Sequence, residues 1–244
     1  MILSGGPAHD FDATSNALAE LLEPDGLTSQ VVTEPGDAFD AISRGQRGHG
    51  PPVDLLTVNA LRWRMEVDRY AHLRDDFAFG LTPQQAALIE RYVLGGGGLL
   101  ALHAAVICFD AEPTWRRLCG AAWNWARSAH PPVGPADVQV TVSGRTHPIT
   151  AGLPDFTITD EVYGFLDEEA GFDPLLCSSH AGRAHPLLWA RELGAGRAVT
   201  DLLGHGGASL SHPTHRTILR RAALWAVGTT PDLPRPAQPV RRRP

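Results

Sequence analysis

Short apolar runs alternate with helix-like segments through the first half of the chain. Three strands are predicted here, at residues 2–4, 30–33 and 53–58. Between the first two, a helix is predicted to run to Leu22 from a cap at Asp12 or Thr14. Strands that alternate with helices are typical of a parallel sheet with helices packed on its faces. The pattern therefore predicts an α/β fold.

The strongest helix signal begins at Thr82. Thr82 and Gln85 form a capping box with proline at the first helical position, and Gly95 ends the helix. The next run, residues 98–103, reads G-L-L-A-L-H and is apolar enough for the middle of a doubly wound sheet. This predicted strand carries His103 at its carboxyl end.

The second half of the chain shows shorter strands separated by turns. A short helix is predicted at residues 115–118, and strands are predicted at 138–142, 175–178, 187–191 and 198–203. These strands indicate antiparallel additions to the sheet. A last helix is predicted at 213–227, with its apolar positions inward and Arg216, Arg220 and Arg221 outward.

Composition sets the size and class of the protein. With 244 residues, 43% of them hydrophobic and 20% charged, the chain can bury a substantial core. We expect one domain over residues 1–230 and a Pro/Arg-rich tail over residues 231–244. All 21 basic residues are arginine, so the chain cannot supply the lysine of a pyridoxal phosphate Schiff base or of a Walker A loop.

Charge and cysteine content narrow the partners and the compartment. A net charge of -6 gives no electrostatic footprint for nucleic acid or an anionic membrane. Three cysteines without C-x-x-C spacing indicate neither a disulfide framework nor a thiolate zinc site. The apolar run at the start of the chain is too short for a signal-peptide core. The longest apolar stretch, residues 99–109, is too short to span a bilayer. We expect a cytoplasmic protein.

The placement of the histidines is the main chemical signal in the sequence. The chain contains 11 of them. His9, His103 and His205 each follow a predicted strand, and His130 lies in a Pro-rich loop. Ligands of open α/β sheets bind outside the carboxyl ends of the strands, so the first three side chains are expected to converge. Taken singly, each histidine could equally be a hydrogen-bonded loop residue.

The D-E-V-Y run adds two carboxylates and a phenol. Asp160 and Glu161 are adjacent and should point apart, whereas Glu161 and Tyr163 share one face of an extended segment. Glu161 and Tyr163 are therefore the preferred site pair. The alternative is a solvated turn.

Weaker candidates have structural alternatives. Gly206 lies between a strand and a helix, where free amides could hold an anion or a sugar hydroxyl. Three tryptophans could offer a flat face to a sugar ring or could pack in the core, namely Trp123, Trp125 and Trp189. His212 and His215 share a helix face, which without H-E-x-x-H is only a weak metal signal.

Several motifs together resemble one known family. The run L-T-P-Q-Q-A-A-L-I-E-R-Y-V-L-G-G-G-G-L-L-A-L-H-A-A is followed in order by H-P-I-T-A-G-L, D-E-V-Y, H-P-L-L-W-A-R-E-L-G-A-G-R and L-G-H-G. This order resembles the ThuA-like (trehalose utilisation) proteins over about residues 2–228.

The resemblance implies a flavodoxin-like fold similar to class I glutamine amidotransferases, with a doubly wound, mostly parallel sheet and antiparallel additions. In amidotransferases the turn after the central strand carries a nucleophilic cysteine, and the corresponding residue here is His103. Imidazole cannot replace that thiolate, and Cys108 lies five residues further on. We therefore expect no glutaminase activity.

The resemblance also implies a set of site residues and partners. By motif match the site residues are His103, Asp160, Glu161, Tyr163 and His205, with His9 and His130 beside them. The family is associated with catabolism of trehalose and similar disaccharides, alongside nicotinamide-dependent sugar oxidoreductases. A carbohydrate ligand and such an oxidoreductase partner are therefore expected. The sequence does not decide between a monomer and a homo-oligomer.

Two classes of function follow. The first is an enzyme acting on a sugar, disaccharide or keto-glycoside, in which His103 or His205 is the base and Glu161 orients the imidazole or protonates the leaving oxygen. In this hypothesis Tyr163 and the Gly206 amide hold hydroxyls or an enolate. Neutral imidazoles and a carboxylate also suit zinc or another divalent ion. The second class is a noncatalytic carbohydrate-sensing or partner-binding module.

Overall fold

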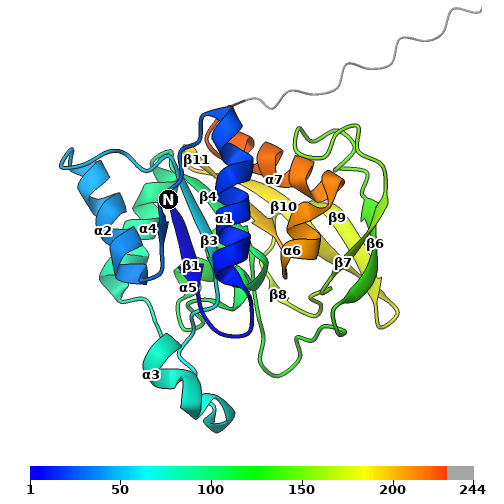
Figure 1. The fold of residues 1–244 in the computed structure, drawn as a ribbon, viewed down its shortest axis with the longest axis horizontal. Coiled ribbons are helices and arrows are strands. Elements are labelled where there is room, and N and C mark those ends of the chain that lie inside the picture. Colours follow the sequence, from blue (N-terminus) through cyan, green and yellow to red (C-terminus); the bar gives the residue numbers. More distant parts are fainter. Residues whose placement is uncertain (230–244) are drawn as a thin grey trace, which may run out of the picture.

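A nine-stranded sheet with a parallel and an antiparallel half forms the centre of the computed structural model, which describes residues 1–229 (Figure 1). The strand order is β2-β1-β3-β4-β11-β10-β9-β6-β7. The parallel half contains β1 (Ile2–Gly5), β2 (Val31–Val32), β3 (Leu55–Ala60), β4 (Gly98–Leu102) and β11 (Gly196–Asp201). The antiparallel half contains β6 (Gly134–Val140), β7 (Phe156–Asp160), β9 (Pro174–His180) and β10 (Arg183–Leu193). The parallel strand order is that of flavodoxin, which confirms the predicted fold class.

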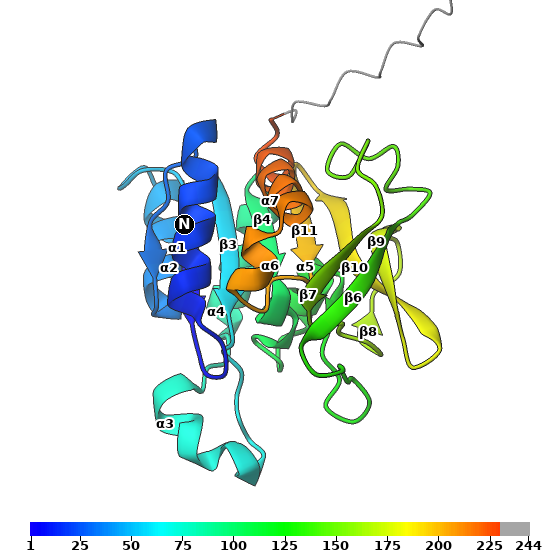
Figure 2. The ribbon, with the colours of Figure 1, turned by 45° about the vertical axis from the view of Figure 1, so that its right-hand side comes forward.

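Helices cover both faces of the parallel half (Figures 1 and 2). One face carries α1 (Phe11–Leu22), α6 (Gly207–Ser211) and α7 (Pro213–Ala226), and the other carries α2 (Pro35–Gln46), α4 (Pro83–Leu94) and α5 (Pro113–Cys119). Shorter elements are η1 (Glu23–Asp25), η2 (Asp68–Leu73), α3 (Arg74–Phe77), η3 (His103–Ile107) and the small sheet of β5 (Ala121–Ala122) with β8 (Asp167–Glu168).

Strand β4 shows why this sheet needs two helical layers. Leu100 and Leu102 pack into the core on the α1 and α7 side, whereas Leu99 and Ala101 pack into the core on the α2 and α4 side. Successive side chains of a strand point to opposite faces, so an uninterrupted apolar run is buried on both. The run that the sequence assigned to the middle of the sheet lies there.

The capping box at α4 is confirmed. The Thr82 hydroxyl accepts a hydrogen bond from the Gln85 backbone N–H at 3.2 Å, and the Gln85 side chain accepts from the Thr82 N–H at 2.9 Å. The predicted cap of α1 is wrong, because Asp10, rather than Asp12 or Thr14, accepts the Ala13 N–H at 3.0 Å.

Other differences from the predictions concern residues whose placement depends on tertiary contacts. Strand β11 was predicted among the antiparallel additions. It pairs antiparallel with β10, but on its other edge it pairs in parallel with β4. Arg221 was predicted on the outer face of α7, yet it is buried and donates to the Ala151 carbonyl at 2.9 Å. Burial lowers the pKa of its guanidinium. The sequence made no prediction for α2 or β7, and the predicted tail lies outside the described residues.

The antiparallel half bends back toward the parallel strands (Figure 2). In the sheet order, three strands separate β7 from β11. Nevertheless the Gly204 N–H, just after β11, donates to Asp160, the last residue of β7, at 2.8 Å. The carboxyl ends of the two strands therefore meet.

Within residues 1–229 we find no helix that is both long and apolar enough to cross a membrane.

Candidate functional site

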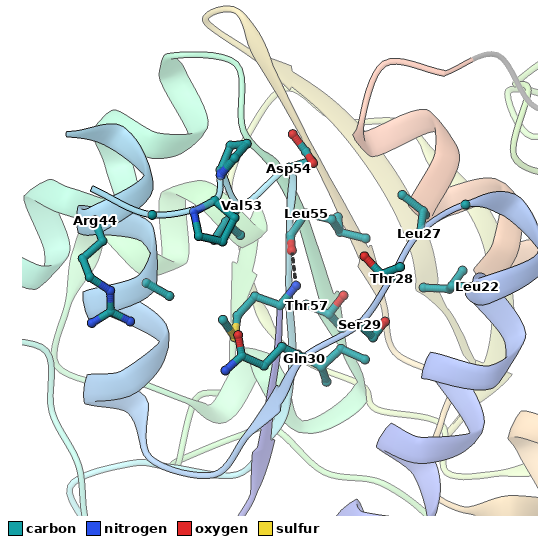
Figure 3. Close-up of a pocket in the computed structure, with 17 residues that line it drawn as sticks. Leu22, Leu27, Thr28, Ser29, Gln30, Arg44, Val53, Asp54, Leu55 and Thr57 are labelled. Atoms are coloured by element: carbon teal, nitrogen blue, oxygen red, sulfur yellow. Dashed lines mark hydrogen bonds between the residues drawn. The ribbon is translucent and has the colours of Figure 1, made fainter. Parts of the chain in front are cut away.

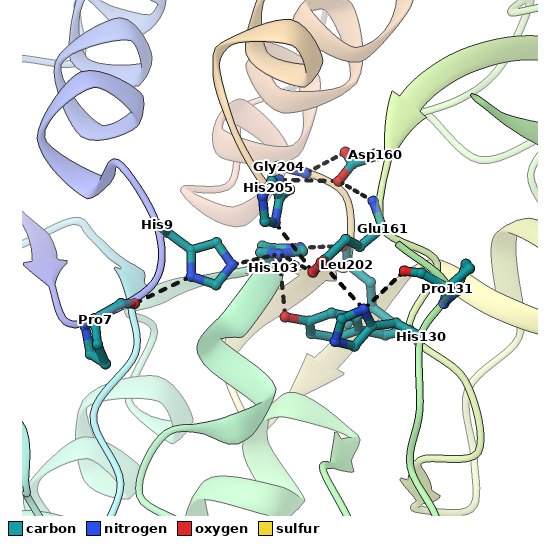
Figure 4. Close-up of polar contacts among 11 residues, drawn as sticks. Pro7, His9, His103, His130, Pro131, Asp160, Glu161, Leu202, Gly204 and His205 are labelled. Carbon is teal, nitrogen blue, oxygen red and sulfur yellow. Dashed lines mark hydrogen bonds and ion pairs between the residues drawn. The ribbon is translucent and has the colours of Figure 1, made fainter. Parts of the chain in front are cut away.

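Four side chains from four strand ends point toward one another (Figure 4). His9 follows β1, His103 follows β4, Glu161 follows β7 and His205 follows β11. One nitrogen or oxygen atom from each lies within 4.8 Å of the others. We call these residues the histidine–glutamate cluster. The predicted convergence of the three histidines occurs in the structure.

The backbone at the end of β4 turns sharply to present His103. Its φ of 48° lies in the left-handed region, which residues other than glycine rarely adopt. Gly204, with φ of +119°, lies against this turn, and a Cβ there would be 3.1 Å from Leu102 Cδ1. The glycine of L-G-H-G therefore lets the turn after β11 approach the turn after β4.

Hydrogen bonds fix the orientation of the His103 ring. Nδ1 lies 2.8 Å from the Leu202 carbonyl oxygen, so Nδ1 carries the proton and donates. Nε2 then accepts from the Tyr163 hydroxyl at 3.3 Å. Burial, together with the neighbouring charges of Glu161 and Asp160, raises the pKa of Tyr163 well above its usual value, so the phenol keeps its proton.

Glu161 is the centre of the site. Its Oε2 lies 3.2 Å from His205 Nδ1 and 3.6 Å from His103 Nε2, and its Oε1 lies 3.2 Å from His130 Nδ1. Burial opposes ionisation, but the neighbouring imidazoles of His103, His130 and His205 outweigh it and lower the pKa of Glu161. The side chain is therefore a carboxylate at neutral pH.

Exposure increases from the floor of the site to its edge. The exposed fraction of the side chain is 1% for His103, 9% for Glu161, 28% for His205 and 38% for His130. Burial, and then the nearby His103 and His205, lower the pKa of His9 to about 4, so His9 is neutral at pH 7. His130 and His205 lie at the exposed edge of the site, where a bound molecule can touch them.

Asp160 was expected to bind substrate, but the structure gives its carboxylate a different environment. It is buried, and it accepts backbone N–H groups of Gly204 at 2.8 Å, His205 at 3.1 Å and Glu161 at 2.8 Å. Both oxygens are thus occupied. Asp160 holds the ends of β7 and β11 together and positions the two neighbouring site residues.

Gly206, the other proposed binding residue, caps α6. Its carbonyl accepts the N–H groups of Ser209 and Leu210, and it is the residue after His205. The structure therefore places it at the start of a five-residue helix beside the cluster.

Aromatic rings extend from the cluster toward the surface. The ring centroid of Trp123 lies 5.2 Å from that of Tyr163 and 6.0 Å from that of His130. Trp125, which is 39% exposed, follows at 6.2 Å from Trp123. Trp189 instead stacks on Phe172 in the core, which is the core-packing alternative that the sequence left open.

His212 and His215 do not share a metal site. His212 stacks on Phe156, whereas His215 is fully buried with Nε2 3.1 Å from Asp201 Oδ2. Nδ1 of His215 lies 3.1 Å from the Ser209 carbonyl. Burial alone would lower the pKa of His215, but Asp201 outweighs burial and raises it. The pair joins α7 to the end of β11.

The raised pKa of His215 predicts a pH-dependent stability. A histidine whose pKa is higher in the folded state than in the unfolded state stabilises the fold. This stabilisation is fully present at pH values below the unfolded-state pKa, about 6.5. The contribution is lost as pH rises through the folded-state pKa. We expect the difference in unfolding free energy between wild type and His215→Gln, measured in urea, to shrink from pH 6 toward pH 9. A pH-independent difference would contradict this.

A hollow of about 370 Å³ lies elsewhere in the described part of the chain (Figure 3). Its lining includes Leu22, Arg44 and Asp54, at the amino ends of β1 and β3. The histidine–glutamate cluster lies at the carboxyl ends of the strands, where open α/β sheets bind ligands. We therefore assign the functional site to the cluster and not to this hollow.

The fold and the left-handed turn after the central strand together define a class I glutamine amidotransferase-like protein. The family model for ThuA, described as trehalose utilisation, matches residues 77–226, which is more than half of the chain. The chain belongs to the ThuA family. Membership supports a role in trehalose utilisation or carbohydrate metabolism.

Solved structures share this fold at low sequence identity. A ThuA-like protein from Parabacteroides merdae matches with TM-score 0.73 and 18% identity, covering 96% of this chain and 92% of that chain. A ThuA-like protein from Bacteroides uniformis matches with TM-score 0.63 and 17% identity, covering 93% and 89%. A β-galactosidase from Rahnella sp. R3 matches with TM-score 0.57 and 13% identity, covering 93% of this chain but 28% of that chain. No curated protein sequence gave a significant match.

Proposed function

We propose that this protein processes a sugar, disaccharide or keto-glycoside by histidine and glutamate acid–base chemistry. The observation that carries the proposal is the position of the Glu161 carboxylate, which contacts imidazoles on both of its oxygens. Two of these imidazoles, His130 and His205, are exposed enough to touch a substrate. The choice of a carbohydrate as the substrate class is supported by membership of the ThuA family.

The arrangement suits removal of a proton beside a carbonyl group. A keto group acidifies the neighbouring C–H bond, and an imidazole with a pKa near 6.5 is an effective base for it at neutral pH. The accessible imidazole that takes the proton is His130 or His205, and Glu161 stabilises the imidazolium that forms. Buried His103, expected from the sequence as an alternative base, lies beneath them and supports the site.

Substrate binding would involve the aromatic rings beside the cluster. Trp123 lies next to His130, and the exposed Trp125 lies beyond Trp123. Sugar rings present apolar C–H faces that pack on aromatic side chains of this kind. A keto-glycoside requires prior oxidation of a sugar hydroxyl. A nicotinamide-dependent sugar oxidoreductase is therefore the partner that we propose.

The test is to incubate the purified protein with glycosides, keto-glycosides and free sugars and to follow each by mass spectrometry. Conversion of one class, with none in a heat-inactivated control, supports the proposal. Binding without conversion, by calorimetry, would replace it with the noncatalytic sugar-binding alternative. Absence of both binding and conversion across all three classes would contradict both.

We also propose that the protein lacks glutaminase activity. The turn that would carry a nucleophilic cysteine carries His103, and the Cys108 thiol is buried and donates to the Ala60 carbonyl at 3.1 Å. Burial raises the pKa of Cys108 to about 12, so almost none of it is thiolate at pH 8.

Cys108 is therefore expected to resist alkylation. Treatment of the native protein with iodoacetamide at pH 8, followed by peptide mass spectrometry, should modify the half-buried Cys177 and leave Cys108 unmodified. In denaturant both should react, which controls for detection. Rapid labelling of Cys108 in the native protein, or release of ammonia from glutamine, would contradict the expectation.

A further inference from the structure

We propose that the histidine–glutamate cluster binds one divalent transition-metal ion of the zinc class through His9, His103, His205 and Glu161. The proposal comes from the spacing of the donor atoms, from the unpartnered Nδ1 of His205 and from the close contact between the His9 and His103 rings. It goes beyond the proposed function because ion binding can be measured without any substrate.

The close contact between the two facing imidazoles produces an electrostatic conflict. His103 Nε2 has a single lone pair, which already accepts the Tyr163 hydroxyl, because Nδ1 donates to a carbonyl. His9 Nε2 lies only 3.2 Å from the same atom. Nδ1 of His9 lies 3.4 Å from the Pro7 carbonyl oxygen.

A neutral His9 cannot satisfy both of its contacts. It carries one N–H, which can face either the Pro7 carbonyl or His103 Nε2. The first choice leaves two bare nitrogens facing each other, and the second leaves a bare nitrogen against a carbonyl oxygen. The Glu161 carboxylate adds a third electron-rich group, 3.6 Å from His103 Nε2. A cation bound to these atoms removes the conflict, and on His103 Nε2 it takes the place of the proton donated by Tyr163.

The spacing of the donor atoms fits a metal. Metal–ligand bonds of 2.0–2.2 Å in tetrahedral geometry place neighbouring ligand atoms about 3.3 Å apart. The corresponding separations here are 3.2 Å between the two Nε2 atoms, 3.6 Å from His103 Nε2 to Glu161 Oε2, and 3.2 Å from that oxygen to His205 Nδ1. These three of the six separations match a metal site, and all six are within 4.8 Å.

His205 supplies an independent observation. Its Nδ1 is buried and makes no hydrogen bond within the described part of the chain, although it faces Glu161. A buried polar atom without a partner is costly, and a bound ion would satisfy it.

Groups behind the ligands complete the arrangement. The Leu202 carbonyl holds Nδ1 of His103, and His130 lies 3.2 Å from the outer oxygen of Glu161. Carbonyl and imidazole partners of this kind orient ligands around protein metals. Three imidazoles and one carboxylate favour zinc, iron or a similar transition metal over magnesium or calcium.

The ion would also decide which imidazole moves the proton. If it takes His205, the exposed imidazole left uncoordinated beside Glu161 is His130. This assignment, unlike the ion site itself, rests on the proposed function.

The experiment uses the full chain without a histidine tag. Protein is stripped with a chelator, incubated with Zn²⁺, Mn²⁺ or Co²⁺, desalted and analysed by elemental mass spectrometry and calorimetric titration. We expect about one ion per chain, and about tenfold or greater loss of affinity in His9→Gln and in His205→Gln. Co²⁺ should show the visible absorption of a four-coordinate site in wild type only.

Matched controls are His49→Gln and His72→Gln, because both histidines are exposed and outside the cluster. They should bind as wild type does. Far-UV circular dichroism checks that each variant is folded. If wild type binds no ion stoichiometrically, the proposal is overturned. A proton on one of the imidazoles would then be the positive charge in the cluster. Equal binding by wild type, His9→Gln and His205→Gln also overturns the proposal. Neither result depends on turnover, so failure here is distinguishable from failure of the proposed function.

Discussion

Replacing Glu161 with glutamine is expected to lower turnover of a keto-glycoside by roughly 10²–10⁴-fold, the usual contribution of acid–base catalysis. Glutamine has nearly the same shape but no charge, so it cannot stabilise an imidazolium at His130 or His205. Both imidazoles lie 3.2 Å from a Glu161 oxygen. The measurement is kcat/KM for the converted substrate, with thermal unfolding to show that the fold is retained.

The matched control is Glu192→Gln. Glu192 is an exposed carboxylate near the end of β10, 3.7 Å from Arg197. It pairs with Arg197 at the start of β11, the opposite end of that strand from His205. Its loss should leave kcat/KM unchanged. Full activity of Glu161→Gln would show that the central carboxylate takes no part in the chemistry.

Replacing Asp160 with alanine is expected to lower the free energy of unfolding by about 3–5 kcal/mol, because three buried backbone N–H donors lose their acceptor at once. The substitution removes the acceptor of three backbone N–H groups, those of Glu161, Gly204 and His205. Each buried donor left without a partner costs about 1–3 kcal/mol, less any interaction regained from water. Urea unfolding at pH 7 measures the effect.

Asp137→Ala provides the comparison. Asp137 is an exposed carboxylate on β6 that accepts a side-chain hydrogen bond from Thr157 at 2.7 Å. We expect its loss to cost less than about 1 kcal/mol. Similar costs for the two variants would mean that Asp160 does not clamp the strand ends.

The sequence predicted the parallel half of the fold and most of the cluster for one physical reason. Apolar runs mark buried strands, and the residue after each run is placed at the same edge of the sheet. His9, His103 and His205 were found in this way. Glu161 was found by its period-two relation to Tyr163, and the structure brings both to His103.

The rest depends on partners that leave no trace in a sequence pattern. Asp160 accepts backbone N–H groups, which every residue except proline has, so nothing in the chain marks its partners. The same holds for Arg221, whose acceptors are carbonyls of residues 149 and 151. The orientation of β11 was misjudged because short strands look alike whichever way they pair.

The position of β11 affects the order in which the sheet can assemble. This strand is the last in the described part of the chain, yet it lies between β4 and β10 and joins the parallel and antiparallel halves. During synthesis the sheet cannot become continuous until residues 196–201 have been made. Pairings between distant segments form slowly, and β4 and β11 are about a hundred residues apart. The site is thus completed at the last stage of folding, so the recovery of its function during refolding should report completion of the whole sheet.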